Sequence, residues 1–178
     1  LRRLAAVLLA LGLAGCFRPM YGELNGEPAV VEQLARINVH VGDGRVGQGL
    51  RNELLYAFNG GGEAAGSGYK LTVSIQQSTE GVILQRSGEA GTTFYELRAK
   101  FTLSDTNTGR VLHGGSAVSR TSYDRTGQIF ANQRAALDAE NRAVKAVARS
   151  IRTRISGYFA IANQAPRAPQ GPEARQGS

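Results

Sequence analysis

The chain has 178 residues and 42% hydrophobic content, which is enough for one ordinary domain with a core. Its net charge of +7 indicates an anionic partner without naming the anion. A single cysteine excludes an intramolecular disulfide framework and a zinc site built from cysteines, and two histidines argue against a multi-histidine metal centre. We therefore expect a protein without metal or cofactor, and not an enzyme.

Residues 1–15 have the pattern of a bacterial lipoprotein signal peptide. Arg2 and Arg3 precede an apolar run over 4–13 that is shorter than the roughly 20 residues a spanning helix needs. The run ends in Leu13-Ala-Gly-Cys16, which resembles a lipobox, whose cysteine is acylated and becomes the new N-terminus. An ordinary secretory signal with an incidental cysteine is the alternative. Both readings export the chain, so nucleic acid is a poor candidate for the anionic partner.

Lipidation at Cys16 would anchor the chain to a membrane through several acyl chains, since one chain binds only marginally. Phe17 follows the cysteine, where an Asp commonly retains such lipoproteins at the inner membrane, so we expect a periplasm-facing protein on the outer membrane. We expect a tether over 16–35, one domain over 36–163, and a disordered, proline-rich tail over 164–178.

Hydrophobic periodicity within the domain predicts an α+β fold. Period-two alternation predicts four strands and a 3.6-residue period predicts two helices. The strands cover 36–41, 69–77, 93–103 and 110–123, and the helices cover 48–59 and 128–163. The order β-α-β-β-β-α predicts a four-stranded mixed sheet with both helices on one face, its first two strands parallel and the rest antiparallel. We expect a bulge at Gly114-Gly115.

The string Gly42-Asp-Gly44-Arg-Val-Gly47 matches the G-x-G-x-x-G pattern of dinucleotide-binding domains and lies between a predicted strand and a predicted helix. The preceding strand alternates, however, whereas the first strand of such a domain is buried on both faces. The acidic residue expected about 20 positions later would be Glu63, which lies in a glycine-rich loop. We interpret the glycines as a flexible turn into a helix, with a dinucleotide-binding module as the alternative.

No catalytic constellation is apparent. His40 and His113 have no Ser or Asp at a spacing typical of a triad, so we expect structural roles for both. A basic surface on the hairpin of the last two strands is the strongest candidate site, because guanidinium groups bind phosphates in bidentate fashion. An ordinary solvated sheet face is the alternative. The candidate cations are Arg86, Arg98, Lys100, Arg110 and Arg120.

The chain resembles the lipopolysaccharide-assembly lipoprotein (LptE) family in its alphaproteobacterial form. The resemblance rests on Leu13-Ala-Gly-Cys16-Phe-Arg-Pro-Met-Tyr-Gly22, the strand over 37–41 and the segment Arg45-Val-Gly-Gln-Gly-Leu-Arg-Asn-Glu-Leu54. It implies a non-enzymatic subunit that plugs the β-barrel lipopolysaccharide translocon of the outer membrane, an LptD-like partner, and helps it to assemble. It also implies contact with lipopolysaccharide, for which the five cations are our candidates. A free-standing lipoprotein that binds another envelope component is the alternative.

Overall fold

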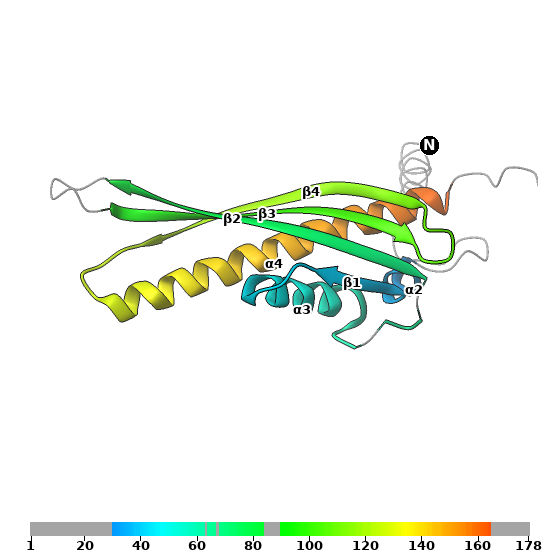
Figure 1. Ribbon diagram of the computed structural model, residues 1–178, viewed down its shortest axis with the longest axis horizontal. Coiled ribbons are helices and arrows are strands. Elements are labelled where there is room, and N and C mark those ends of the chain that lie inside the picture. Colours follow the sequence, from blue (N-terminus) through cyan, green and yellow to red (C-terminus); the bar gives the residue numbers. More distant parts are fainter. Residues whose placement is uncertain (1–29, 63, 67, 84–89, 165–178) are drawn as a thin grey trace, which may run out of the picture.

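The computed structural model describes residues 30–62, 64–66, 68–83 and 90–164 (Figure 1). Cys16, Arg86 and residues 165–178 of the predicted tail lie outside this part of the chain. Seven elements follow one another along the described residues. They are α2 (Val30–Ala35), β1 (Ile37–Val41), α3 (Arg45–Asn59), β2 (Tyr69–Ile83), β3 (Ala90–Asp105), β4 (Val111–Asp124) and α4 (Ile129–Ala162).

The strands form a four-stranded mixed sheet in the order β1-β2-β3-β4. β1 runs parallel to β2, with Ile37 opposite Tyr69, and α3 makes the crossover between them. β2 with β3 and β3 with β4 pair in antiparallel fashion. The predicted α+β fold and its strand directions are confirmed, with the short helix α2 as an addition at the front of the order.

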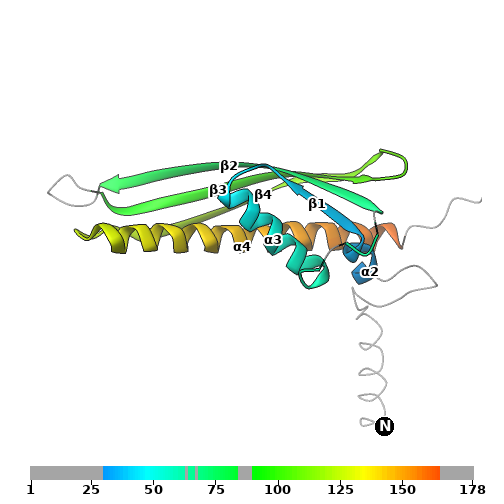
Figure 2. The same ribbon diagram turned by 60° about the horizontal axis from the view of Figure 1, so that its bottom comes forward.

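Both long helices pack on the same face of the sheet, as Figure 2 shows. The alternation of β3 places Leu97, Ala99, Phe101 and Leu103 on that face, where all four are buried. Each helix turns a buried apolar stripe toward the sheet. The stripe of α3 contains Leu50, Leu54 and Phe58, and that of α4 contains Val147, Ile151, Ile155 and Phe159. Among the described residues, no helix covers the opposite face of the sheet (Figures 1 and 2). Within the described residues, none of the helices combines the length and apolar character needed to cross a membrane.

α2 lies within the range that we expected to be tether. Its Val30 and Leu34 are buried in the common core, and Gln33 is only 7% exposed. A spacing of four residues puts Val30 and Leu34 on one helix face, which packs against α3 and α4. The packed domain therefore extends back to Val30, because one helical turn carries enough apolar surface to join the core.

The two glycines of β4 do not form the bulge that we expected. Gly114 and Gly115 pair regularly with Thr102 and Phe101, and the register shift lies nearer the turn, where Leu112 is the extra residue. A Cβ added at Gly115 would lie 3.0 Å from Cζ of Phe101. The glycine therefore lets the Phe101 ring pack directly on the backbone of β4.

β2 is longer than its alternation predicts. Beyond Gln77 it continues through Ser-Thr-Glu-Gly-Val to Ile83, with Ser78 opposite Glu96 and Glu80 opposite Phe94 on β3. This part of the strand has little apolar patterning, so pairing with β3 holds it extended. The β2–β3 hairpin consequently projects beyond β1 and α3 (Figure 1).

Candidate functional site

Three of the predicted cations lie together on the open face of the sheet. Arg98 and Lys100 project from β3 on the side away from the helices, since residues two apart share a face. Arg120 projects from β4 on the same side, directly opposite Glu96. All three side chains are exposed, so the structure brings Arg98, Lys100 and Arg120 onto one accessible surface, which we call the open sheet face.

Two of these three cations have carboxylate partners. Nη2 of Arg98 lies 2.8 Å from Oε1 of Glu96, and Nη2 of Arg120 lies 3.3 Å from Oε2 of Glu80. The guanidinium carbon of Arg120 also lies 4.4 Å from the centroid of the Phe94 ring. Exposed ion pairs contribute only about 0–1 kcal/mol, so a strong external anion could exchange with either carboxylate.

Lys100 has no carboxylate within 4.0 Å among the described residues. Its strand neighbours are Ser74 on β2 and Ser116 on β4, which are neutral hydrogen-bonding groups. Of these three cations, Lys100 is therefore the one most available to an external anion.

The other two predicted cations are not part of this cluster. Arg110 lies at the β3–β4 turn, where its carbonyl accepts a hydrogen bond from the backbone N–H of Asp105. At about 3.4 Å per strand residue it is roughly 17 Å along the sheet from Lys100 and roughly 30 Å from Arg120. Arg86 falls outside the described residues, so its place relative to the cluster stays a prediction.

Hydrogen bonds hold the turn that carries Arg110. The Asp105 carboxylate accepts from the backbone N–H groups of Thr108 and Asn107 and from the Thr108 hydroxyl. These bonds, those from Thr108 above all, lower the pKa of Asp105 below its ordinary value of 3.8. The turn is thus fixed by local chemistry.

His113 faces the helices, where its ring stacks on Tyr158 with centroids 5.2 Å apart and tilts toward Phe101 at 5.9 Å. This aromatic packing gives His113 a structural role between the first residues of β4 and the last turns of α4. Among the described residues, no group of three or more His, Cys, Asp and Glu side chains is placed to hold a metal ion.

The G-x-G-x-x-G string has a structural explanation in the turn before α3. Gly44 adopts a φ of 102°, which disfavours other residues. A Cβ added at Gly47 would collide with the carbonyl oxygen of Gly42. The first turn of α3 thus packs directly on the backbone that enters it, and the glycine spacing follows from this close approach.

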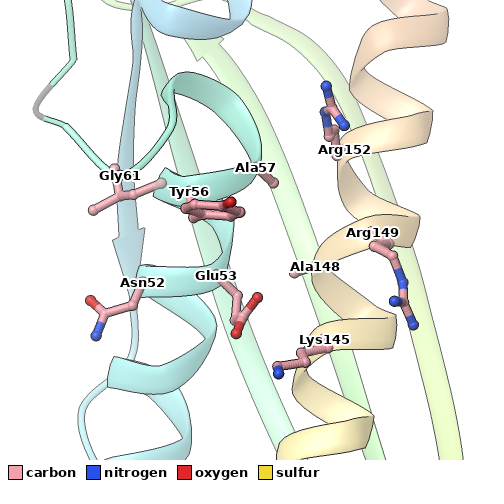
Figure 3. Close-up of a pocket in the computed structure, with 10 residues that line it drawn as sticks. Asn52, Glu53, Tyr56, Ala57, Gly61, Lys145, Ala148, Arg149 and Arg152 are labelled. Carbon is pink, nitrogen blue, oxygen red and sulfur yellow. The ribbon is translucent and has the colours of Figure 1, made fainter.

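A groove of about 740 Å³ runs between α3 and α4 on the helical side of the molecule (Figure 3). Its α3 wall carries Glu53 and Tyr56, whose side chain is 70% exposed. Its α4 wall carries Lys145, Arg149 and Arg152. These cations were not among the predicted site residues, although their spacing of four and three residues indicates a shared helix face.

No protein-family model and no curated protein matches the sequence. Solved structures do match it. A candidate lipoprotein from Caulobacter crescentus CB15 aligns with a TM-score of 0.61 and 25% identity, over 74% of this chain and 96% of the other. The fold is that of a bacterial lipoprotein.

Two further structures extend the similarity to the rare lipoprotein B group. Rare lipoprotein B from Shewanella oneidensis aligns with a TM-score of 0.50 and 11% identity, over 72% of this chain and 96% of the other. Lipoprotein B from Nitrosomonas europaea aligns with a TM-score of 0.51 and 13% identity, over 80% of this chain and 95% of the other. At these identities the similarity establishes a shared fold.

Proposed function

We propose that this chain is an outer-membrane lipoprotein that plugs and helps to assemble the β-barrel lipopolysaccharide translocon, and that it contacts lipopolysaccharide during insertion. The observation that carries the proposal is a fold shared with the Caulobacter lipoprotein, in a chain whose N-terminal region contains Leu13-Ala-Gly-Cys16. The resemblance of the sequence to the lipopolysaccharide-assembly family supplies the identity of the partner.

In this proposal Cys16 carries the acyl chains that hold the protein at the membrane. The described domain begins at Val30, so the thirteen residues 17–29 separate it from the anchor. Fully extended, these residues span at most about 50 Å, which lets the domain reach a partner embedded in the same membrane.

The open sheet face would supply the contact with lipopolysaccharide. Lys100 is available to a phosphate, while Arg98 and Arg120 can exchange a weak surface carboxylate for a stronger bidentate phosphate contact. Phe94 adds an aromatic surface beside Arg120. No covalent step is needed, because the proposed role is binding and positioning.

Pull-down of purified, detergent-solubilised protein with lipopolysaccharide tests the binding surface. The Arg98→Glu/Lys100→Glu variant should bind at least tenfold more weakly, since each lost contact to a charged group contributes about 1.5–3 kcal/mol. A control variant with the same change of charge, Arg149→Glu/Arg154→Glu on α4, should keep most of the binding. Equal binding by the sheet variant and the original protein would remove the open sheet face from the proposal.

A further inference from the structure

The cations of the α3–α4 groove form a line. Lys145, Arg149 and Arg152 follow one another along α4, and a rise of 1.5 Å per residue places them about 6 Å and 4.5 Å apart along the axis. Figure 3 shows the Lys145 side chain extending toward α3, the Arg152 side chain extending along the helix, and the Arg149 side chain extending to the side of α4 away from α3. A line of charges suits a ligand with acidic groups spaced along a backbone better than a single anion.

Two of these cations are free to accept such a ligand. Lys145 and Arg149 are exposed, and neither has a carboxylate within 4.0 Å among the described residues. Glu53 is the acidic residue of the groove lining, so the groove carries an excess of positive charge. The lining also contains Leu55, Ala57 and Ala148, and such a mixture of apolar surface with a few charged groups is typical of binding grooves.

The chain that precedes α2 joins the described domain at Val30, near the C-terminal end of α4. α2 packs against both α3 and α4, and its Gln33 is hydrogen-bonded to Asn163 at the end of α4. Asn163 lies about 17 Å along the helix from Arg152 and about 27 Å from Lys145. Residues 17–29 therefore have the groove within their reach.

The composition of residues 17–29 complements the groove. The segment reads Phe-Arg-Pro-Met-Tyr-Gly-Glu-Leu-Asn-Gly-Glu-Pro-Ala and contains Glu23 and Glu27 against a single arginine, together with four large apolar side chains. In an extended chain the two glutamates would lie about 13 Å apart, close to the roughly 10.5 Å between Lys145 and Arg152.

We propose that residues 17–29 dock into the α3–α4 groove, with Glu23 and Glu27 facing the cations of α4 and the apolar side chains against the groove floor. Attachment to the domain favours this occupant over a separate acidic peptide, because the local concentration of a tethered segment reaches the millimolar range. Docking through Glu23 leaves the six residues 17–22 between it and Cys16, which shortens the reach to the anchor from about 50 Å to about 25 Å. The helical side then faces the anchor and leaves the open sheet face for partners, which goes beyond the proposed translocon role.

Paramagnetic relaxation in the unlipidated mature chain tests the docking. The chain from residue 16 is made with Cys16→Ser and Asn25→Cys, and the new cysteine carries a nitroxide. Docking should broaden the backbone amide signals of Tyr56 and Ala148. The Lys145→Glu/Arg149→Glu variant should reduce the docked population at least tenfold and restore sharp signals, and the further change Glu23→Lys/Glu27→Lys should restore the broadening.

The matched control is Arg98→Glu/Lys100→Glu, which changes the net charge equally on the opposite face and should leave the broadening unchanged. Sharp groove signals in the unmodified background would overturn the proposal. So would equal broadening in the groove variant, and so would broadening that increases with protein concentration, which would assign the groove to a second copy. Each of these results is independent of whether the protein binds a β-barrel or lipopolysaccharide.

Discussion

Gln33 and Asn163 lie 130 residues apart in the sequence, yet their side-chain amides exchange two hydrogen bonds. Nε2 of Gln33 donates to Oδ1 of Asn163 at 3.1 Å, and Nδ2 of Asn163 donates to Oε1 of Gln33 at 3.2 Å. The pair joins α2 to the end of α4. It therefore fixes the point at which the segment from Cys16 enters the domain.

Replacement of either member of this pair should destabilise the domain. Gln33→Leu removes both hydrogen bonds between the two amides in a partly buried site, at a cost of about 1–3 kcal/mol. The double variant Gln33→Leu/Asn163→Leu should lose less than the sum of the two single variants, because each single variant already removes the same pair of hydrogen bonds. Urea unfolding of all four proteins measures the coupling, and strict additivity would show that the two amides do not interact.

The glycines of α3 allow a comparison within a single helix. Gly47→Ala should destabilise the protein by about 1–3 kcal/mol or more, because the added methyl meets the Gly42 carbonyl oxygen. Gly49→Ala adds the same methyl 3.9 Å from Cγ1 of Val144, an ordinary contact, and should stabilise the helix by up to about 1 kcal/mol. Thermal unfolding measures both changes, and a neutral Gly47→Ala would remove the structural explanation of the glycine string.

The pH dependence of stability should show the ionisation of Tyr95. Burial, with a smaller contribution from Glu140, raises the pKa of Tyr95 to about 12 from an ordinary value of 10.0. In its neutral form the phenol hydroxyl of Tyr95 donates a hydrogen bond to Oε1 of Gln77 at 3.1 Å. Because the folded pKa is the higher one, the stabilising contribution is complete below pH 10 and is lost as the pH rises toward 12.

Tyr95→Phe provides the control for this prediction, since it keeps the ring and removes the ionisable group. Chemical unfolding at intervals between pH 9 and 11.5 should show a steeper loss of stability in the original protein than in the variant. Parallel curves would mean that Tyr95 ionises equally in the folded and unfolded chains.

The ion pairs of the open sheet face should affect lipopolysaccharide binding more than they affect the stability of the domain. Glu96→Gln removes the partner of Arg98 while Arg98 stays exposed, so the domain should lose less than about 1 kcal/mol of stability. The same change should strengthen binding of lipopolysaccharide, because Arg98 no longer shares its charge. Weaker binding by Glu96→Gln would indicate that the carboxylate, rather than the cation, makes the contact.

Local patterning accounts for most of the fold. The alternation of Leu97, Ala99, Phe101 and Leu103 predicted both the strand and its buried face, and the stripe of α4 predicted its packing. α2 escaped prediction because six residues are too few to show a helical period, and its burial depends on surfaces supplied by α3 and α4. The extension of β2 to Ile83 escaped it because pairing, not alternation, defines that stretch.

Sites depend more strongly on tertiary contacts than strands do. The sequence placed Arg98 and Lys100 on one strand face, but the carboxylates of Glu96 and Glu80 beside Arg98 and Arg120 appear only once strand register is known. The α3–α4 groove needs two helices separated by most of the domain to lie side by side. Gly115 shows the same dependence, since the absence of a side chain there leaves space for the Phe101 ring of the neighbouring strand.

The translocon proposal is tested most directly by co-purification. The membrane-bound protein is extracted in mild detergent and purified by an affinity tag on this chain, and the proteins that co-purify with it are identified. We expect one large outer-membrane β-barrel protein in equimolar amount, and loss of the membrane-bound complex in Cys16→Ser. Recovery of the lipidated chain alone, or with a different envelope component, would contradict the translocon proposal and favour a free-standing lipoprotein.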